Sequence, residues 1–134
     1  MGRHSAAITT TLVITIAAAA ACGGAREIEV RHAAVPEVDD SVYVQVSNDQ
    51  FYDARVYVLY EGGARYSLGL ITGHMKSAVT PVLWQPRPML FEISFIAREG
   101  LYYSEEVVVD PGDMVFVSIP PNIGSSAFFR RGGY

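Results

Sequence analysis

From Val42 onward, apolar and polar residues alternate along the chain with a period of two. Successive side chains of a β-strand point to opposite faces, so this spacing predicts strands with one buried face. The apolar positions that recur in this way are Val42, Val44, Val46, Ala54, Val56, Val58, Tyr60, Tyr66, Leu68, Leu70, Met89, Phe91, Ile93, Phe95, Ala97, Val115, Val117 and Ile119. No segment after residue 22 combines helical spacing with helix caps, so the pattern favours an all-β domain.

Glycine, proline and aspartate mark turns between the alternating segments, at residues 61–64, 99–100 and 110–113. Seven or eight short strands at spacings of about 8 to 12 residues predict an antiparallel β-sandwich. In strand number and spacing the chain resembles an immunoglobulin-like module, although it lacks the paired cysteines of antibody domains. A small closed β-barrel is the alternative architecture.

The alternation also sets the expected boundaries of the domain. Residues 42–120 form the predicted β-sandwich, and the pattern is lost after Pro120, so residues 121–134 are predicted to be a C-terminal tail. Before the sandwich, Ile28 and Val30 alternate with charged residues until Pro36 interrupts them. This lead-in is predicted to be either a first edge strand or a tether.

The start of the chain has the composition of an export signal. Arg3 precedes an alanine-rich apolar run over residues 8–21, and Ala19-Ala20-Ala21 leads directly into Cys22, the only cysteine, and Gly23-Gly24. This arrangement resembles the signal of bacterial lipoproteins, although the leucine usual three residues before the cysteine is alanine here. The resemblance implies a signal peptide over residues 1–21, a lipid on Cys22, and an anchor and lead-in segment over residues 22–41.

Two other interpretations of this segment remain open. The three alanines also suit ordinary secretory cleavage, which would release a soluble secreted protein. An uncleaved transmembrane helix is less favoured, because the apolar run is shorter than the roughly 20 residues needed to cross the hydrocarbon core.

Charge excludes one class of partner. The chain carries 10 Lys and Arg against 14 Asp and Glu, a formal net charge of −4. Nucleic-acid-binding proteins need a basic surface that displaces counterions from phosphates, and the only basic pair is Arg130-Arg131. We therefore expect no nucleic acid among the partners.

The sequence offers no pattern for catalysis or metal binding. His32 and His74 are far apart, and Glu29 would converge with His32 on a metal only in a helix. No nucleophile-elbow spacing accompanies the serines. The acidic residues Asp39, Asp40, Asp49 and Asp53 fall in two predicted loops and offer oxygen ligands for calcium, but their spacing matches no EF-hand. We expect no catalytic residues, no metal and no cofactor.

Aromatic residues suggest a contact surface. If the valines of the first two strands face the core, then Tyr43, Tyr57 and Leu59 point outward and form a candidate binding face. The candidate occupants are glycan rings, a partner protein and a second copy of the domain. Alternatively, Phe128 and Phe129 of the tail fold back over this face.

These observations predict a membrane-anchored, non-enzymatic binding or assembly module of the bacterial cell envelope, attached through lipid at Cys22. The alternative function is a glycan-binding domain, with Tyr43 and Tyr57 as a stacking platform and Gln45 and Arg55 at its rim. An exported hydrolase is the least favoured, because no catalytic constellation supports it.

Overall fold

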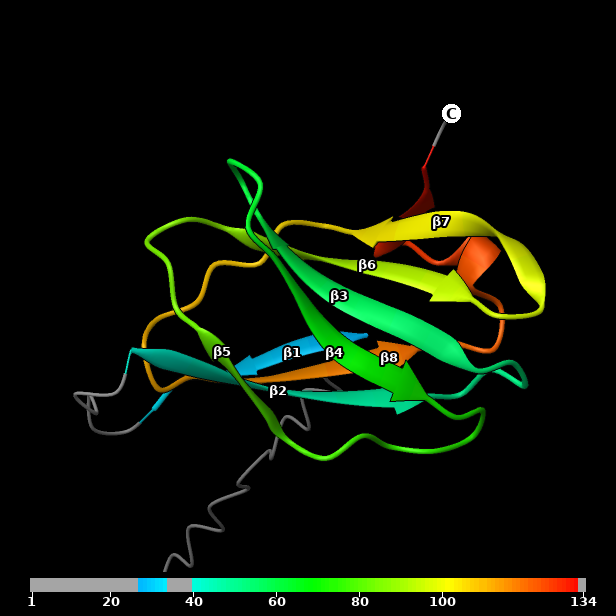
Figure 1. Cartoon of the computed structure of the whole chain (residues 1–134), viewed down its shortest axis with the longest axis horizontal. Helices are drawn as coiled ribbons and strands as arrows, with labels where there is room; N and C mark the ends of the chain where they lie inside the picture. The colour runs from blue at the N-terminus through cyan, green and yellow to red at the C-terminus, as the bar shows by residue number, and fades with distance from the viewer. Residues whose placement is uncertain (1–26, 34–39, 133–134) are drawn as a thin grey trace, which may run out of the picture.

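The computed structural model describes residues 27–33 and 40–132, which form two β-sheets packed face to face (Figure 1). The described strands are β1 (Ile28–Arg31), β2 (Ser41–Asn48), β3 (Ala54–Tyr60), β4 (Arg65–Ile71), β5 (Thr80–Leu83), β6 (Met89–Phe95), β7 (Arg98–Ser104), β8 (Met114–Ile119) and β9 (Phe129–Arg131). A short 3₁₀ helix, η1 (Ile123–Ser125), precedes β9. The all-β sandwich is confirmed, and the closed barrel is wrong.

One pair of strands departs from the predicted antiparallel arrangement. The five-stranded sheet has the order β4-β3-β6-β7-β9 and is antiparallel throughout. The four-stranded sheet has the order β1-β8-β2-β5, and β2 and β8 are parallel, with Val44 opposite Val115. Period-two alternation is the same in parallel and antiparallel strands, so it could not predict this pairing.

The core consists of the alternating residues, and the prediction for most of them is confirmed. In β2 and β8 every second residue is buried, and Phe91 and Ile93 of β6 are fully buried. Ala97 is an exception, because the chain turns at residues 96–97 rather than at the predicted 99–100. Gly100, with a φ of 121°, lies inside β7. Leu70 of the edge strand β4 is also exposed.

The sandwich extends beyond residues 42–120 at both ends. Residues 28–31 form the edge strand β1, which pairs with β8. The expected tail is part of the fold, because β9 pairs with β7, and Ile123 and Phe129 are buried in the core. A tail prediction failed here because β9 contributes only one buried residue, too few to show a period.

The predicted signal peptide and Cys22 lie outside the described residues. Within residues 27–33 and 40–132, no helix has the length and hydropathy needed to cross a bilayer.

The loops divide between two ends of the sandwich. Strands β2, β4, β6 and β8 all finish at one end, whereas β1 starts there (Figure 1). Hydrogen bonds join the loops at this end, from the backbone N–H of Asn48 to the Met75 carbonyl and from that of Ile96 to the Asp53 carbonyl. We call this end, formed by residues 48–53, 70–76 and 96–97, the loop end.

Candidate functional site

The predicted aromatic face is split between the two sheets. Tyr43, Tyr57 and Leu59 are all half-buried and sit at the outward positions of their strands, as the alternation requires. Tyr43, however, belongs to β2 in the four-stranded sheet, whereas Tyr57 and Leu59 belong to β3 in the five-stranded sheet. The outward sides of the two sheets point away from each other, so the three residues do not form one face. Alternation predicts which side of a strand is buried but not the sheet to which it belongs.

The ring of Tyr57 already has a partner within the chain. The guanidinium of Arg65 lies over the Tyr57 ring, 3.6 Å from its centroid. Arg65 also donates a hydrogen bond of 2.6 Å to Glu92, which raises the pKa of its guanidinium. A sugar ring stacking on the same side of Tyr57 would have to displace this arginine.

The loop end exposes a concentration of large apolar side chains. They are Phe51, Tyr52, Leu70, Met75 and Ile96. Phe51 is the most exposed of them, at 79%, and its ring meets the rings of Tyr52 and His74 edge-on, at centroid distances of 5.7 and 6.4 Å. Soluble domains rarely gather apolar side chains in this way unless the surface makes a contact.

Buried amides hold the loop end together. Asn48 is fully buried, and its Nδ2 donates to the carbonyl oxygens of Tyr52 and Ile71 at 2.8 and 3.0 Å. Its Oδ1 accepts from the backbone N–H of Gln50, whose own Nε2 donates to the Pro120 carbonyl at 2.6 Å. Satisfied buried amides of this kind fix loop geometry, because breaking any one of these bonds would leave a buried polar atom without a partner.

Backbone strain is found in the same place. His74 has a φ of 59°, the only positive φ of a residue other than glycine in the part of the chain that the structure describes. Its N–H donates to the Gln50 carbonyl at 3.0 Å, and the N–H of Gly73 donates to Asp53 Oδ1 at 3.0 Å. A left-handed conformation costs such a residue about 1–2 kcal/mol and persists only where the surroundings enforce it.

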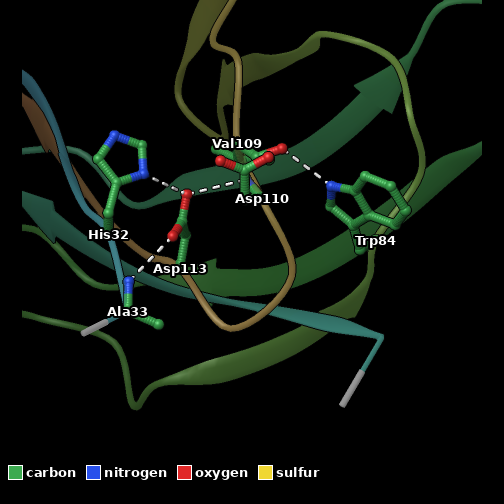
Figure 2. Close-up of polar contacts among 6 residues, drawn as sticks. All are labelled: His32, Ala33, Trp84, Val109, Asp110 and Asp113. Atoms are coloured by element: carbon green, nitrogen blue, oxygen red, sulfur yellow. Dashed lines mark hydrogen bonds and ion pairs between the residues drawn. The ribbon is translucent and has the colours of Figure 1, made fainter. Parts of the chain in front are cut away.

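A second cluster lies at the opposite end of the sandwich, where β1 ends and β8 begins. Figure 2 shows its polar contacts. His32 Nδ1 donates to Asp113 Oδ2 at 2.8 Å, and the same carboxylate accepts the backbone N–H groups of Ala33 and Asp110. With the Asp110 carboxylate, three possible metal ligands lie within 4.8 Å of one another. Because Asp113 is buried and both its oxygens accept N–H groups, the geometry assigns it a structural role: it fastens the end of β1 to the turn before β8.

A groove of about 340 Å³ runs beside this cluster, between β1 and the segment that follows β7. Its lining combines apolar and charged side chains: Ile28, Val30, His32, Glu105, Glu106, Val107, Val108 and Phe128. The groove is large enough for a small ligand. Its two glutamates disfavour an anionic one.

The acidic loops proposed for calcium do not meet. Asp40 precedes β2, whereas Asp49 and Asp53 follow it, so eight residues of strand separate the two groups. Asp49 accepts a hydrogen bond from the Ser47 hydroxyl, and Asp53 accepts one from the backbone N–H of Gly73. Asp39 lies outside the described residues.

Sequence reasoning missed the loop end as an apolar surface. In the sequence, the pair Phe51-Tyr52 is the signal for this apolar surface. The two residues stand in an otherwise polar loop, where no core position is expected. Met75 and Ile96 carry no signal of their own, because only the fold brings them to the same end.

Comparison with known proteins identifies no family. No protein-family model, no curated protein and no solved structure matches the chain.

Proposed function

We propose that the chain is a lipid-anchored, non-enzymatic binding or assembly module of the bacterial cell envelope, and that the loop end is its contact surface. The observation that carries the proposal is Phe51, which is 79% exposed although it belongs to the loop that the buried Asn48 and Gln50 amides hold in place.

The free energy of folding alone does not explain this arrangement. Burying a phenylalanine side chain contributes about 1.5–3 kcal/mol, and this loop forgoes that gain while also holding His74 in a left-handed conformation. A rigid, exposed aromatic loses little conformational entropy when it binds, so these costs can be recovered in a complex. The exposed, fixed Phe51 loop therefore supports the proposal of a preformed contact surface.

The lipid anchor rests on the sequence around Cys22. Small residues precede the only cysteine, and an apolar run with an arginine before it completes an export signal. Lipid on Cys22 would leave no free thiol in the exported chain, as suits an oxidising compartment. An exported and membrane-anchored location follows from this part of the proposal, with soluble secretion as its alternative.

The glycan-binding alternative gains no support from the geometry. Tyr43 and Tyr57 lie on different sheets, and Arg65 covers one side of the Tyr57 ring. A planar stacking platform built from both tyrosines is therefore not available.

The contact surface can be tested by site-specific photocrosslinking in intact cells. A photoreactive residue replaces Phe51 at the loop end or, as the control, the exposed Glu61 in the hairpin at the other end. We expect adducts from position 51 and few from position 61. If position 51 gave no adducts, or no more than position 61, the proposal that the loop end is the contact surface would be wrong.

The anchor is tested separately, by the intact mass of the protein purified from membranes. We expect a product that starts at residue 22 and carries added lipid, and Cys22→Ser should release the protein or stall its processing. An unlipidated product in the medium would refute the anchor and support secretion.

A further inference from the structure

We infer that the loop end docks onto the surface of the bilayer that holds the lipid of Cys22, so that the sandwich stands on the membrane with its opposite end outward. This inference rests on the proposed lipid anchor and names the occupant of the proposed contact surface. It follows from where the chain enters the fold, how short the connection to Cys22 is, and what the loop end exposes.

The chain enters the sandwich at the loop end. The Glu27 carbonyl accepts the N–H of Ser118 at 2.6 Å, and Ser118 lies opposite Ser47 on β2. Neighbouring strands lie about 4.8 Å apart, so two strand spacings place Glu27 about 10 Å from Ser47, near the end of β2 that leads into the Phe51 loop. The Ser126 hydroxyl also donates to the Glu27 carboxylate, which fixes this entry point beside η1.

The connection from this point to Cys22 is short. Five peptide units join Cys22 to Glu27, and covalent geometry limits their span to about 17 Å. The eight residues of β2 extend over about 26 Å. The lipid attachment point therefore reaches the loop end but falls short of the opposite end, and an upright sandwich brings the loop end to the bilayer.

The exposed side chains suit a bilayer surface. Phe51, Met75 and Ile96 are more than half exposed, and Tyr52 adds an aromatic ring with a polar tip, the type of side chain that is enriched at the lipid–water boundary. Lys76 is exposed next to Met75 and can face anionic headgroups.

Charge at the opposite end favours the same orientation. Asp40, Glu61 and Asp110 are exposed there, and an anionic membrane surface repels carboxylates within about one Debye length. At the loop end, Asp49 is an exposed carboxylate, and the exposed Lys76 offsets its charge. The orientation also leaves His32, which follows the end of β1, on the side away from the bilayer.

A fluorescent label at the loop end tests the docking directly. The full-length gene is expressed with Met75→Cys, or with Glu61→Cys as the control, and the processed, lipidated protein is purified. The introduced thiol is labelled with the fluorophore NBD, which the lipid-linked Cys22 cannot take up. The protein is then placed in phosphatidylethanolamine and phosphatidylglycerol vesicles with brominated acyl chains. We expect the label at position 75 to shift its emission to the blue and lose most of its intensity, and the label at position 61 to do neither.

A second variant separates docking from mere proximity. Phe51→Ser in the Met75→Cys background should restore most of the lost emission, with Ile96→Ser as the substitute if urea unfolding shows that Phe51→Ser disturbs the fold. The intact mass of every sample reports the lipid independently. If the protein carries its lipid but the label at position 75 is quenched no more than the label at position 61, the docking proposal is wrong. The loop end would then be the contact surface for a protein partner. A product without lipid at Cys22 instead refutes the proposed anchor itself.

Discussion

Gly73 lies directly against the backbone of Phe51. A β-carbon at position 73 would come within 2.7 Å of the Phe51 carbonyl carbon and closer still to its oxygen, so no larger residue fits without moving the loop. Gly73, the second residue after the strand β4, thus sets the position of the most exposed aromatic side chain of the described chain.

We therefore predict that Gly73→Ala destabilises the domain by about 1–3 kcal/mol, the usual cost of forcing atoms into packed structure. Urea unfolding followed by circular dichroism measures the change in the free energy of unfolding. Gly124→Ala is the matched control, because the nearest atom to a β-carbon there lies 3.8 Å away. Equal stability of the two variants would show that the two loops are not packed together.

The C-terminal segment is predicted to be essential for stability. Phe129 is 2% exposed, and Phe129→Ala should cost about 3–5 kcal/mol because it leaves a cavity in the core. Arg131→Ala, at an exposed position two residues later in β9, should change the free energy of unfolding by less than about 0.5 kcal/mol. If deletion of residues 121–134 left the urea midpoint unchanged, the segment would be a tail after all.

The buried carboxylate of Asp113 provides another test. Asp113→Ala removes the acceptor for the N–H groups of Ala33 and Asp110 and for His32, and should cost about 2–4 kcal/mol. Hydrogen exchange should accelerate at the Ala33 amide in particular, because the end of β1 loses its attachment. Asp49→Ala, which removes an exposed carboxylate, should leave this amide protected. Unchanged protection at Ala33 in the Asp113 variant would contradict the fastening role.

Local alternation was enough to predict the class of fold. The burial of Val44, Val58 and Phe91 follows from a period of two, and this period does not depend on how the strands are ordered. What alternation lacks is information about partners. It assigned Tyr43 and Tyr57 to the outside but not to opposite sheets, since strand order depends on contacts distant in sequence.

The site was less predictable than the fold for the same reason. His32 and Asp113 are 81 residues apart, and neither position has a neighbour that suggests the other. Phe51 lies in a loop, where the alternation of apolar and polar residues makes no prediction. Only the folded chain shows that Met75 and Ile96 lie at the same end of the sandwich.

The last prediction concerns stability at high pH. Burial is the main cause that raises the pKa of Tyr60 to about 12, with the neighbouring Tyr66 as a smaller cause. The Tyr60 hydroxyl donates to the Leu83 carbonyl at 3.0 Å, a hydrogen bond that only the neutral phenol can make. An unfolded chain releases this proton near pH 10, so between about pH 10 and pH 12 the folded state binds more protons than the unfolded state.

The stabilisation that Tyr60 contributes should therefore be fully present and constant below about pH 10, and the free energy of unfolding should fall by about 2 kcal/mol as the pH rises toward 12. Urea unfolding at about pH 8 and about pH 11 measures the decline, and Tyr60→Phe should make it shallower while lowering stability at pH 8 by roughly 0.5–1.5 kcal/mol through the lost hydrogen bond. Tyr103→Phe is the comparison variant. The pKa of Tyr103 is also raised, first by burial and second by the Glu92 carboxylate, so its pH effect has the same direction as that of Tyr60. If Tyr60→Phe kept the full decline of the natural chain, the Tyr60 hydroxyl would not be the buried, neutral donor that its contact with Leu83 indicates.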